Sequence, residues 1–494
     1  MVELYASEGP MPNYLNPMDA AYTSYQKSRI RHWDEVARLM DRWTGLGGAY
    51  HRRLTRIYRS LVAPGQRVLE IGCGRGDLLA SLQPAVGVGV DFSSEMIQRA
   101  GQRHPELRFL RIDAHDLSAL QESFDAIILS DLVNDLWDVQ TVMEQVARLA
   151  TPRTRIILNS YSRLWELPLA AVERLGLARP TLYQNWLTVE DIANLLSLAD
   201  MEVIRSWHEV MWPLPVPVLE PLANRYLVKL WPFQHLGLTN FVVARLSPCR
   251  PAPREEPLVS VIVPARNEAG NIERILARTP EMGRGTELVF VEGHSTDGTY
   301  EAIQEAMARH PERRCRLMRQ TGVGKGDAVR LGFEQASGDI LMILDADLTV
   351  PPEDLPRFYD VLRSGKGEFV NGVRLVYPME QQAMRFLNLL GNKFFSLAFR
   401  WLLGQPIKDT LCGTKVLWRE DYRRIAANRA YFGNFDPFGD FDLLFGAARL
   451  NLKIVDLPIR YRQRTYGSTN IQRWRHGLLL LQMVLFAARR IKFV

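Results

Sequence analysis

The sequence predicts an α/β protein built from two domains, and three observations carry that prediction. Its 494 residues exceed what a single hydrophobic core usually supports. Short apolar strands alternate with helical patterns in both halves, as in parallel α/β domains. Between the halves, the stretch 247–257 holds four prolines in eleven residues, a composition typical of a linker. We therefore expect domains at 1–246 and 258–494, joined by the linker 247–257.

The overall composition is that of an ordinary globular protein, with 47% hydrophobic and 23% charged residues. The N-terminus has neither a basic start nor an apolar run, so we expect no secretory signal. The four cysteines lie far apart and form no CxxC, which argues against a disulfide framework or a zinc site. These features favour a reducing, cytoplasmic setting.

Positive charge is concentrated at the C-terminal end. The whole chain carries a formal net charge of +6, whereas residues 457–494 hold eight Lys and Arg and no Asp or Glu. Such a tail indicates an anionic partner, either nucleic acid or a membrane surface. The longest apolar run, 477–488, is shorter than the ~20 residues that a membrane-spanning helix needs.

The first half contains a glycine loop followed by acidic strand ends. In VLEIGCGRGDLL an apolar strand leads through Gly72, Gly74 and Gly76 into a helix, so that the backbone can approach a ligand closely. The next two strands end in Asp91 and Asp113, at the edge where open α/β sheets bind ligands. The loop alone is equally compatible with a structural turn. A dinucleotide loop would have glycine where Asp77 stands.

The combination of these residues resembles the class I S-adenosylmethionine-dependent methyltransferases over about 60–246. The resemblance implies a loop that holds the amino-acid part of the cofactor, an acid that holds the ribose and an acid that reaches the adenine. The cofactor-binding residues that it implies are Glu70, Gly72, Gly74, Gly76, Asp91, Asp113, Ala114 and Ser130. The methyl acceptor cannot be read from the sequence. Asp131, Asn134 and His32 are candidates for positioning a hydroxyl, or else surface or capping residues.

The second half places polar residues at the ends of successive apolar strands. VSVIVPARNE ends its strand at Pro264, and ELVFVEGHSTDGT has Glu292 at the strand end. Lys325 lies among three glycines, where it could meet a phosphate. MILDADL then brings Asp345 and Asp347 to the end of a further strand. All these residues should lie on one rim of a parallel sheet.

Asp345 and Asp347 are close enough to repel each other, and a diphosphate at the same rim would add to the repulsion. Mg²⁺ or Mn²⁺ would relieve it, because these hard cations prefer oxygen ligands. The metal would also stabilise the charge on a leaving diphosphate. The alternative is that the two carboxylates only cap the helix that begins near Pro351 and Pro352.

Together these motifs resemble the family-2 inverting glycosyltransferases of the GT-A fold, and among them the dolichyl- and polyprenyl-phosphate sugar synthases. The likeness rests on VPARNE, STDGT, GKGDA, DADLTVPPEDL, GVR (372–374), DTLCGTK (409–415) and RTYGSTN (464–470). It implies three sets of residues: nucleotide-sugar contacts at Pro264, Glu268, Glu292, Lys325 and Asp345; metal ligands at Asp345 and Asp347; acceptor contacts at Arg374, Arg464 and Ser468. Glu292-Gly293-His294-Ser295 replaces the usual Asp-Asp-Gly-Ser, so the specificity for the nucleotide base stays open. The QxxRW signature of processive synthases is absent, which disfavours polymer synthesis.

Two segments suggest contact with a membrane. In 383–404 a polar stripe (Arg385, Asn388, Asn392, Ser396, Arg400) follows a helix that is otherwise rich in Leu and Phe. This helix and 477–488 would suit a membrane interface, or would pack on the core of the protein itself. We expect a cytoplasmic protein peripheral to the membrane.

The sequence thus favours a bifunctional enzyme that transfers a sugar from a nucleotide sugar to a polyprenyl phosphate, with metal, and a methyl group from S-adenosylmethionine. The alternative acceptor is a glycan hydroxyl. A phosphate with a second pKa of about 6 needs no general base, whereas a hydroxyl would require Asp409 or Asp440 as one. A third hypothesis makes the N-terminal half a degenerate methyltransferase that only binds. Nucleic acid is not expected as a partner, because no aromatic stacking motif accompanies the basic tail.

Overall fold

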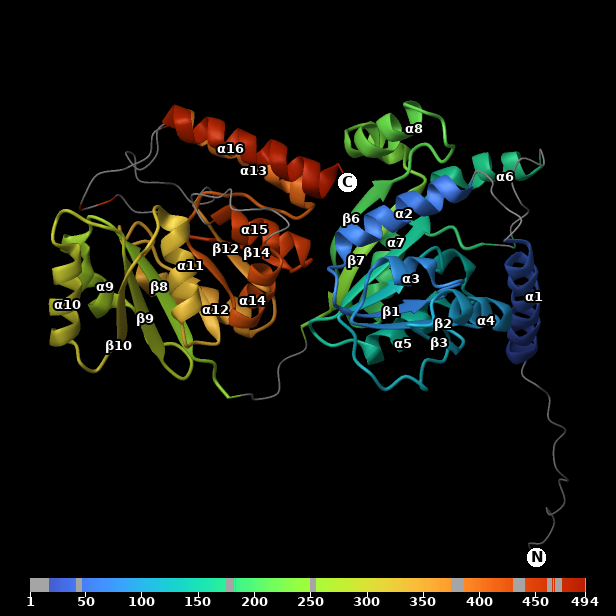
Figure 1. The fold of residues 1–494 in the computed structure, drawn as a ribbon, viewed down its shortest axis with the longest axis horizontal. Helices are drawn as coiled ribbons and strands as arrows, with labels where there is room; N and C mark the ends of the chain where they lie inside the picture. Colours follow the sequence, from blue (N-terminus) through green and yellow to red (C-terminus); the bar gives the residue numbers. More distant parts are fainter. Residues whose placement is uncertain are drawn as a thin grey trace, which may run out of the picture.

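The computed structural model describes residues 17–40, 47–174, 182, 184–248, 255–374, 386–429, 440–459, 464, 466 and 473–493. Within these, the description excludes the side chains at 17–21, 39–40, 47, 172–173, 386–393, 440, 473–477 and 479–480. Two separate seven-stranded sheets, each flanked by helices, confirm the predicted fold class (Figure 1).

The first sheet has the strand order β3-β2-β1-β4-β5-β7-β6. Its strands are β1 (Arg67–Ile71), β2 (Val86–Asp91), β3 (Arg108–Arg111), β4 (Ala126–Leu129), β5 (Arg155–Tyr161), β6 (Met201–Glu209) and β7 (Thr239–Leu246). The first five run parallel, and β7 inserts antiparallel between β5 and β6. The glycine loop, Asp91 and Asp113 therefore come to one edge of the sheet.

Eight helices of the described residues belong to this domain: α1 (Pro17–Met40), α2 (Gly47–Leu61), α3 (Asp77–Ser81), α4 (Ser94–Arg103), α5 (Val139–Leu149), α6 (Glu166–Arg174), α7 (Val189–Leu198) and α8 (Leu219–Pro221). Local sequence sets several helix starts. Ser93 accepts a hydrogen bond from the Met96 amide (3.1 Å) at the start of α4, and Thr188 with Asp191 forms a capping box on α7.

The second sheet has the order β10-β9-β8-β11-β13-β12-β14. Its strands are β8 (Val259–Ala265), β9 (Thr286–Glu292), β10 (Arg314–Arg319), β11 (Ile340–Ile343), β12 (Phe369–Val373), β13 (Lys415–Trp418) and β14 (Ile454–Pro458). Only β13 is antiparallel to its neighbours β11 and β12. The carboxyl ends of β8, β9, β11, β12 and β14 and the amino end of β13 consequently meet at one rim.

The helices of this domain form a layer on each face of the sheet. They are α9 (Ile272–Arg278), α10 (Thr299–Arg309), α11 (Lys325–Gln335), α12 (Leu355–Arg363), α13 (Phe386–Leu403), α14 (Arg419–Ala427), α15 (Asp440–Arg449) and α16 (Arg473–Ala487), which a π-helical turn (Ala488–Lys492) extends. Along β8 the side chains alternate: Val261 and Val263 join the core beneath α9 and α12, whereas Ile262 joins the core beneath α11.

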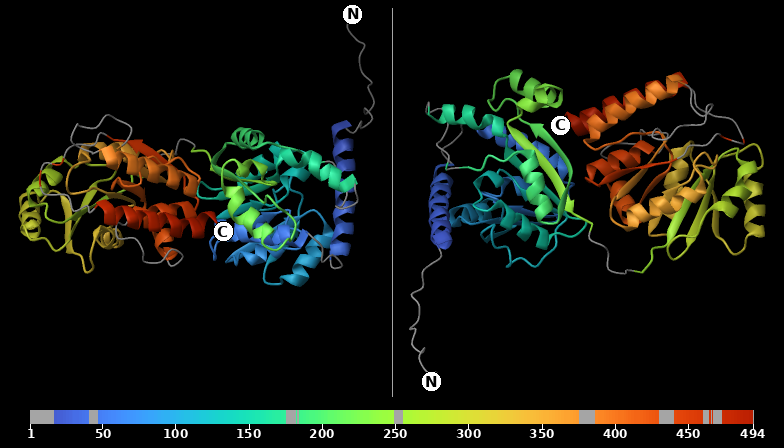
Figure 2. Two further views of the ribbon diagram at one scale, coloured as in Figure 1. Left: turned by 90° about the horizontal axis from the view of Figure 1, so that it is seen from above. Right: turned by 180° about the vertical axis from the view of Figure 1, so that it is seen from behind.

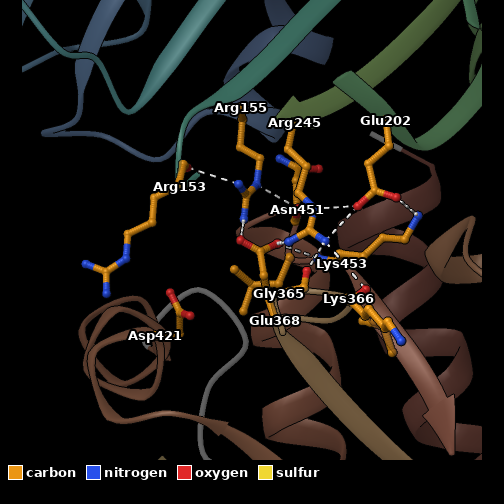
Figure 3. Close-up of polar contacts among 12 residues, drawn as sticks. Arg153, Arg155, Glu202, Arg245, Gly365, Lys366, Glu368, Asp421, Asn451 and Lys453 are labelled. Carbon is orange, nitrogen blue, oxygen red and sulfur yellow. Dashed lines mark hydrogen bonds and ion pairs between the residues drawn. The ribbon is translucent and has the colours of Figure 1, made fainter. Parts of the chain in front are cut away.

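The two domains pack directly against each other (Figures 1 and 2). At their contact, the Glu368 carboxylate accepts a hydrogen bond from Arg155 Nη2 (2.7 Å) and forms an ion pair with Arg245 Nη1 (3.4 Å). Figure 3 shows these side chains with Asn451, whose backbone carbonyl accepts from Arg155 Nε at 2.8 Å. We call this surface, together with the contacts of Asn451, the seam.

The two helices proposed to touch a membrane also contribute to the core. Phe399 and Leu402 of α13 pack with Met483 and Val484 of α16, while the opposite faces expose Phe394, Leu397, Leu478, Leu481 and Leu485. Of the predicted polar stripe the structure describes the side chains of Ser396 and Arg400, while those of Arg385, Asn388 and Asn392 lie outside the described residues. Arg400 is exposed, and the Ser396 hydroxyl donates to the Ile407 carbonyl (2.8 Å). Among the helices that the structure describes, none combines the length and apolar character needed to cross a bilayer.

Candidate active sites

A pocket of ≈ 470 Å³ opens at the carboxyl edge of the first sheet. Four of the predicted cofactor-binding residues line it: Gly72, Asp91, Asp113 and Ala114. The other four predicted residues, Glu70, Gly74, Gly76 and Ser130, are not among its lining residues. Glu70 is buried and accepts from the Leu79 amide (3.0 Å), and Ser130 lies beside the Tyr58 hydroxyl.

The glycine loop is held in place by the second-strand acid. Asp91 accepts from the Gly74 amide (3.0 Å) and the Ser93 amide (2.9 Å). A Cβ on Gly76 would lie 2.5 Å from the Phe109 ring, whereas one on Gly74 would meet no atom within 4 Å. The space beside Gly74 is therefore open, as a bound ligand would require. Burial raises the pKa of Asp91 to about 6 and that of Glu70 to about 8.

The helix α1 covers this pocket, and the sequence analysis did not anticipate it. Asp113 accepts hydrogen bonds from Tyr22 Oη (3.0 Å) and Gln26 Nε2 (2.5 Å), both on α1. Burial alone would raise the pKa of Asp113, but hydrogen bonds from His115 and Gln26 outweigh burial and hold it below its ordinary value. Arg29 of α1 pairs with Asp135 across the same pocket. The sequence pattern that could have indicated this contact is the spacing of Tyr22, Gln26 and Arg29, which places the three side chains on one helix face.

A hydrogen-bonded cluster surrounds Asp131, just after β4. Asp131 Oδ1 accepts from Tyr50 Oη (2.7 Å) and Asn159 Nδ2 (2.5 Å), and Tyr58 Oη donates to Asn159 (2.6 Å). Burial raises the pKa of Asp131, while the nearby His51 opposes that rise. Asp131 also has a left-handed φ of 53°, which is uncommon outside glycine.

The two other residues considered for positioning the methyl-accepting hydroxyl make different contacts. Asn134 bridges two backbone groups, because Nδ2 donates to the Asn185 carbonyl (2.6 Å) and Oδ1 accepts from the Tyr161 amide (2.9 Å). His32 lies on α1 with its ring 5.5 Å from that of Trp33. Of the three, Asp131 is the residue whose carboxylate accepts from both a tyrosine hydroxyl and an asparagine amide.

In the second domain, Lys325 and the two aspartates meet at the rim of the sheet. Lys325 Nζ lies 2.6 Å from Asp345 Oδ1. Asp347 Oδ1 accepts from the Thr349 amide (3.1 Å) and hydroxyl (2.8 Å). Burial, then the negative charge of Asp345, raises the pKa of Asp347. Gly413, from the predicted DTLCGTK motif, approaches so closely that a Cβ there would collide with both Asp345 and Lys325.

The remaining nucleotide-sugar residues lie at the same rim. Pro264 is the next-to-last residue of β8. Glu292 is the last residue of β9 and accepts from the Ser295 amide (2.5 Å). Glu268 pairs with Arg464 and also accepts from Asn271 Nδ2 (2.8 Å). The structure thus brings a predicted acceptor residue, Arg464, against a predicted nucleotide residue.

Arg374 and Asp409 form a bidentate pair between the ends of β12 and β13. Arg374 donates through Nε (2.7 Å) and Nη2 (2.9 Å) to the two carboxylate oxygens, and its amide donates as well (3.1 Å). The Asp409 side chain is 1% exposed. Burial would raise its pKa, but Arg374 outweighs burial and keeps the pKa below its ordinary value. Ser468 and the side chain of Asp440 lie outside the described residues.

Three turns at this rim contain non-glycine residues with left-handed φ: Asn267 (57°), His294 (57°) and Leu348 (55°). They follow β8, β9 and β11, one in each predicted motif. Side chains stabilise the first two turns, because the Asn267 amide donates to Ser295 Oγ (3.0 Å) and Asn267 Oδ1 accepts from the Thr296 amide (2.9 Å). Such conformations are often found at functional sites.

Fold and sites together define a transferase with two α/β domains, and comparisons with known proteins specify its class. The family model described as "Methyltransferase domain" matches residues 68–153, and the one described as "Glycosyl transferase family 2" matches residues 260–425. The chain belongs to glycosyl transferase family 2 and carries a methyltransferase domain ahead of it, so both predicted resemblances are confirmed.

Three curated relatives illustrate the similarity. Glycosyltransferase AglJ of Haloferax volcanii is 30% identical over 221 residues, which cover 44% of this chain and 68% of the relative. Undecaprenyl-phosphate 4-deoxy-4-formamido-L-arabinose transferase of Pseudomonas aeruginosa is 37% identical over 231 residues (46% and 64%). Dolichol-phosphate mannosyltransferase of Pyrococcus furiosus is 29% identical over 220 residues (43% and 59%). The chain spans between 59% and 68% of the length of these relatives.

Proposed function

We propose that the second domain transfers a sugar from a nucleotide sugar to a polyprenyl phosphate. The observation that carries this proposal is the cluster of Asp345, Asp347 and Lys325 beside the Arg374–Asp409 pair, on one rim of the sheet. The printed names of two relatives, which specify dolichol phosphate and undecaprenyl phosphate, support this acceptor class.

The state of Asp409 favours a phosphate acceptor over a hydroxyl. A hydroxyl needs a general base with a pKa near the working pH. Asp409 is instead ion-paired on both oxygens with Arg374, and its pKa lies below the ordinary value. We assign it a positioning role, in which it fixes the Arg374 guanidinium toward an anionic acceptor. An ionised phosphate can attack without losing a proton.

Asp345 and Asp347 fit a divalent metal ion. They offer carboxylate oxygens, which suit Mg²⁺ and Mn²⁺. Burial and the negative charge of Asp345 both raise the pKa of Asp347, and a cation between the two carboxylates would favour their ionised form. Among the described residues, neither this rim nor any other place gathers three or more His, Cys, Asp or Glu that could hold a metal ion. When bound, the metal would stabilise negative charge on the departing diphosphate. Lys325, whose ammonium pairs with Asp345, can bind other oxygens of the same diphosphate.

The first domain, in this proposal, transfers a methyl group from S-adenosylmethionine to a hydroxyl. The pocket fits the cofactor, because Asp91 and Asp113 line it and the space beside Gly74, in the same glycine loop as the lining residue Gly72, is open. Asp131, with its raised pKa, accepts the hydroxyl proton, and Tyr50 and Asn159 orient its carboxylate. Asp131→Asn should lower the methylation rate about a hundredfold or more, with cofactor affinity unchanged.

We further propose that the enzyme works at a membrane surface. The helices α13 and α16 lie at the same edge of the molecule as α8 (Figures 1 and 2), and both carry exposed Leu or Phe side chains. Amphipathic helices of this kind insert their apolar face at the lipid–water boundary.

The sugar transfer is tested by incubating the full-length protein with a panel of nucleotide sugars, Mg²⁺ or Mn²⁺, and undecaprenyl phosphate. Mass spectrometry should detect one glycolipid, and a matched incubation with undecaprenol should give none. A product from undecaprenol or from a soluble glycan, with none from the phosphate, would establish the hydroxyl alternative instead.

A further inference from the structure

A second pocket, of ≈ 570 Å³, lies at the seam, away from both candidate active sites. The first domain contributes residues of α2, β6 and the segment after α8, and the second contributes α13, α15 and the 488–492 turn. We call it the seam pocket. Its charged lining residues are Arg205, Lys229, Arg449, Arg490, Lys492 and Glu209.

Positive charge in the seam pocket exceeds what its carboxylate neutralises. Glu209 already serves two buried cations, because Lys229 and Arg53 both pair with it, and Trp207 Nε1 donates to it at 2.9 Å. Arg205 stacks on the Trp207 ring (4.8 Å), and Lys492 lies 5.5 Å from the centre of the Trp401 ring. Within the described part of the chain, neither Arg205 nor Lys492 has a carboxylate at ion-pair distance.

Burial and neighbouring positive charge both act on these cations. Burial, then the charge of Arg449, lowers the pKa of Arg205. Burial, then Arg205, lowers the pKa of Lys492 to about 8. The Nε of Arg205 is buried and has no hydrogen-bond partner. Like charges held together away from water repel strongly, and a bound anion would remove that cost.

We propose that the seam pocket is a binding site for a phosphate group, held by Lys492 and Arg205 between the two domains. A phosphate offers several strong acceptor oxygens, which match the donor fork of arginine and the ammonium of lysine. The site is separate from the proposed sugar and methyl transfer and does not depend on either.

The phosphate could belong to a small soluble compound or to a lipid headgroup. Exposed apolar side chains flank the pocket region on both domains, including Leu485 of α16 and Tyr226, whose ring lies 5.2 Å from that of Phe493. The chemistry at Lys492 and Arg205 is the same for both sources, so experiment must separate them.

The first part of the test measures the binding of soluble phosphate to the protein. Calorimetry and thermal unfolding of the full-length protein use inorganic phosphate and pyrophosphate, with chloride at equal ionic strength as reference. The test variant is Lys492→Met, which keeps an unbranched side chain over Trp401. The matched control is Arg489→Gln, because Arg489 carries the same charge in the same turn but is exposed and lies outside the pocket lining.

We expect phosphate to raise the melting temperature of the wild type and of Arg489→Gln. Lys492→Met should bind phosphate about tenfold or more weakly, the usual effect of losing one charge-assisted hydrogen bond. Equal stabilisation by chloride, or equal responses of the two variants, overturns the site. Unchanged unfolding of Lys492→Met without phosphate shows that the variant folds.

The second part of the test uses vesicles of phosphatidylcholine with and without phosphatidylglycerol. Weaker binding of Lys492→Met than of Arg489→Gln to the anionic vesicles, with competition by pyrophosphate, assigns the site to a lipid headgroup. Equal vesicle binding of both variants, with the loss of free-phosphate binding retained, assigns it to a soluble phosphate. If neither part of the test separates the two variants, the proposal is wrong.

Discussion

Asp347 carries the clearest consequence at the scale of single residues, because burial and the negative charge of Asp345 both raise the pKa of its carboxylate. Asp347→Asn removes this carboxylate while its amide oxygen can still accept from Thr349. We expect sugar transfer to fall by about a hundredfold or more, as when one preorganised electrostatic contact is lost. Thermal unfolding without metal should be unchanged or slightly improved, and the stabilisation by Mn²⁺ should disappear.

The matched control for this prediction is Asp354→Asn, a carboxylate of the same DADLTVPPEDL stretch that pairs with Arg357 (3.6 Å) away from Asp345. It should keep both activity and the response to Mn²⁺. Full sugar transfer by Asp347→Asn, or by the wild type in excess chelator, would remove the metal role.

Glu70 predicts a pH dependence of stability in the first domain. Its pKa is raised from 4.5 to about 8 by burial, so the folded state binds a proton that the unfolded state has released. Stability therefore falls as the pH rises from about 4.5 toward 8. Glu70→Gln removes this loss, and at pH 8 it should be more stable than the wild type by on the order of 4 kcal/mol.

Urea unfolding at pH 5, 6.5 and 8 measures this effect, with Glu106→Gln as the control because that carboxylate is exposed. A shallower slope should remain in Glu70→Gln, since Asp91 has a pKa raised to about 6 and acts in the same direction. Parallel pH profiles of Glu70→Gln and the wild type would contradict the assignment.

At the scale of single residues, the sequence allowed prediction of the site residues that directly follow a recognisable strand. Asp345, Asp347 and Lys325 follow strands that could be recognised from their apolar runs, and the structure brings them together. The pairing of Arg464 with Glu268 joins residues 196 positions apart, and no local pattern encodes it. The positioning role of Asp409 likewise depends on Arg374, whose orientation is set by tertiary contacts.

At the scale of elements, α13 and α16 show why periodicity gave two open interpretations. Each helix has an apolar face in the core and another that is exposed, and a sequence pattern cannot show what covers a face. Removing the C-terminal tail would be a poor test of membrane contact, because α16 contributes Met483, Val484 and Ala487 to the core.

Substitutions on the exposed face give a sharper prediction. Leu478→Asn with Leu485→Asn changes two side chains that are 60% and 56% exposed, so the fold should be retained. Burying one such side chain in lipid is worth about 2 kcal/mol, and the pair should reduce vesicle binding by at least tenfold. Co-sedimentation with phosphatidylglycerol vesicles at high salt measures this, because salt screens the contribution of the basic residues.

Leu198→Asn is the control, since Leu198 is 56% exposed at the end of α7, on neither α13 nor α16. Its vesicle binding should equal that of the wild type. If the double variant also binds as the wild type does, the exposed leucines do not contact lipid.

At the scale of the whole molecule, the sequence predicted two domains and a proline-rich connection but not the seam. Arg155 and Glu368 are 213 residues apart, and each would be read from the sequence as an ordinary surface charge. Asn451 lies where α15 ends with a left-handed φ of 52°, and its side chain reaches Arg205 (2.6 Å) and the Leu61 carbonyl (3.0 Å). Docking of the domains therefore rests on polar groups whose partners only the fold supplies.

This arrangement predicts that Glu368 couples the unfolding of the two domains. Its side chain is 10% exposed and lies between Arg155 and Arg245, whose side chains are 5% and 4% exposed. Glu368→Gln would leave the buried Arg155 guanidinium without its carboxylate, whereas Arg245 would keep its pair with Glu202 (2.7 Å). Breaking a buried pair in this way costs about 3–5 kcal/mol. We expect scanning calorimetry to show one transition for the wild type and two separated transitions for the variant.

The surface pair Arg153–Glu420 provides the matched control, because it also joins the domains but its side chains are 48% and 56% exposed. Such a pair contributes about 0–1 kcal/mol, so Glu420→Gln should keep the single transition.

Acid should have the same effect on the unfolding transitions as Glu368→Gln. Arg155 and Arg245 outweigh burial and lower the pKa of Glu368, so its contribution is present above pH 4.5 and is lost as the pH falls through the lowered value. A single transition in Glu368→Gln at neutral pH would show that apolar contacts at the seam, rather than this ion pair, hold the domains together.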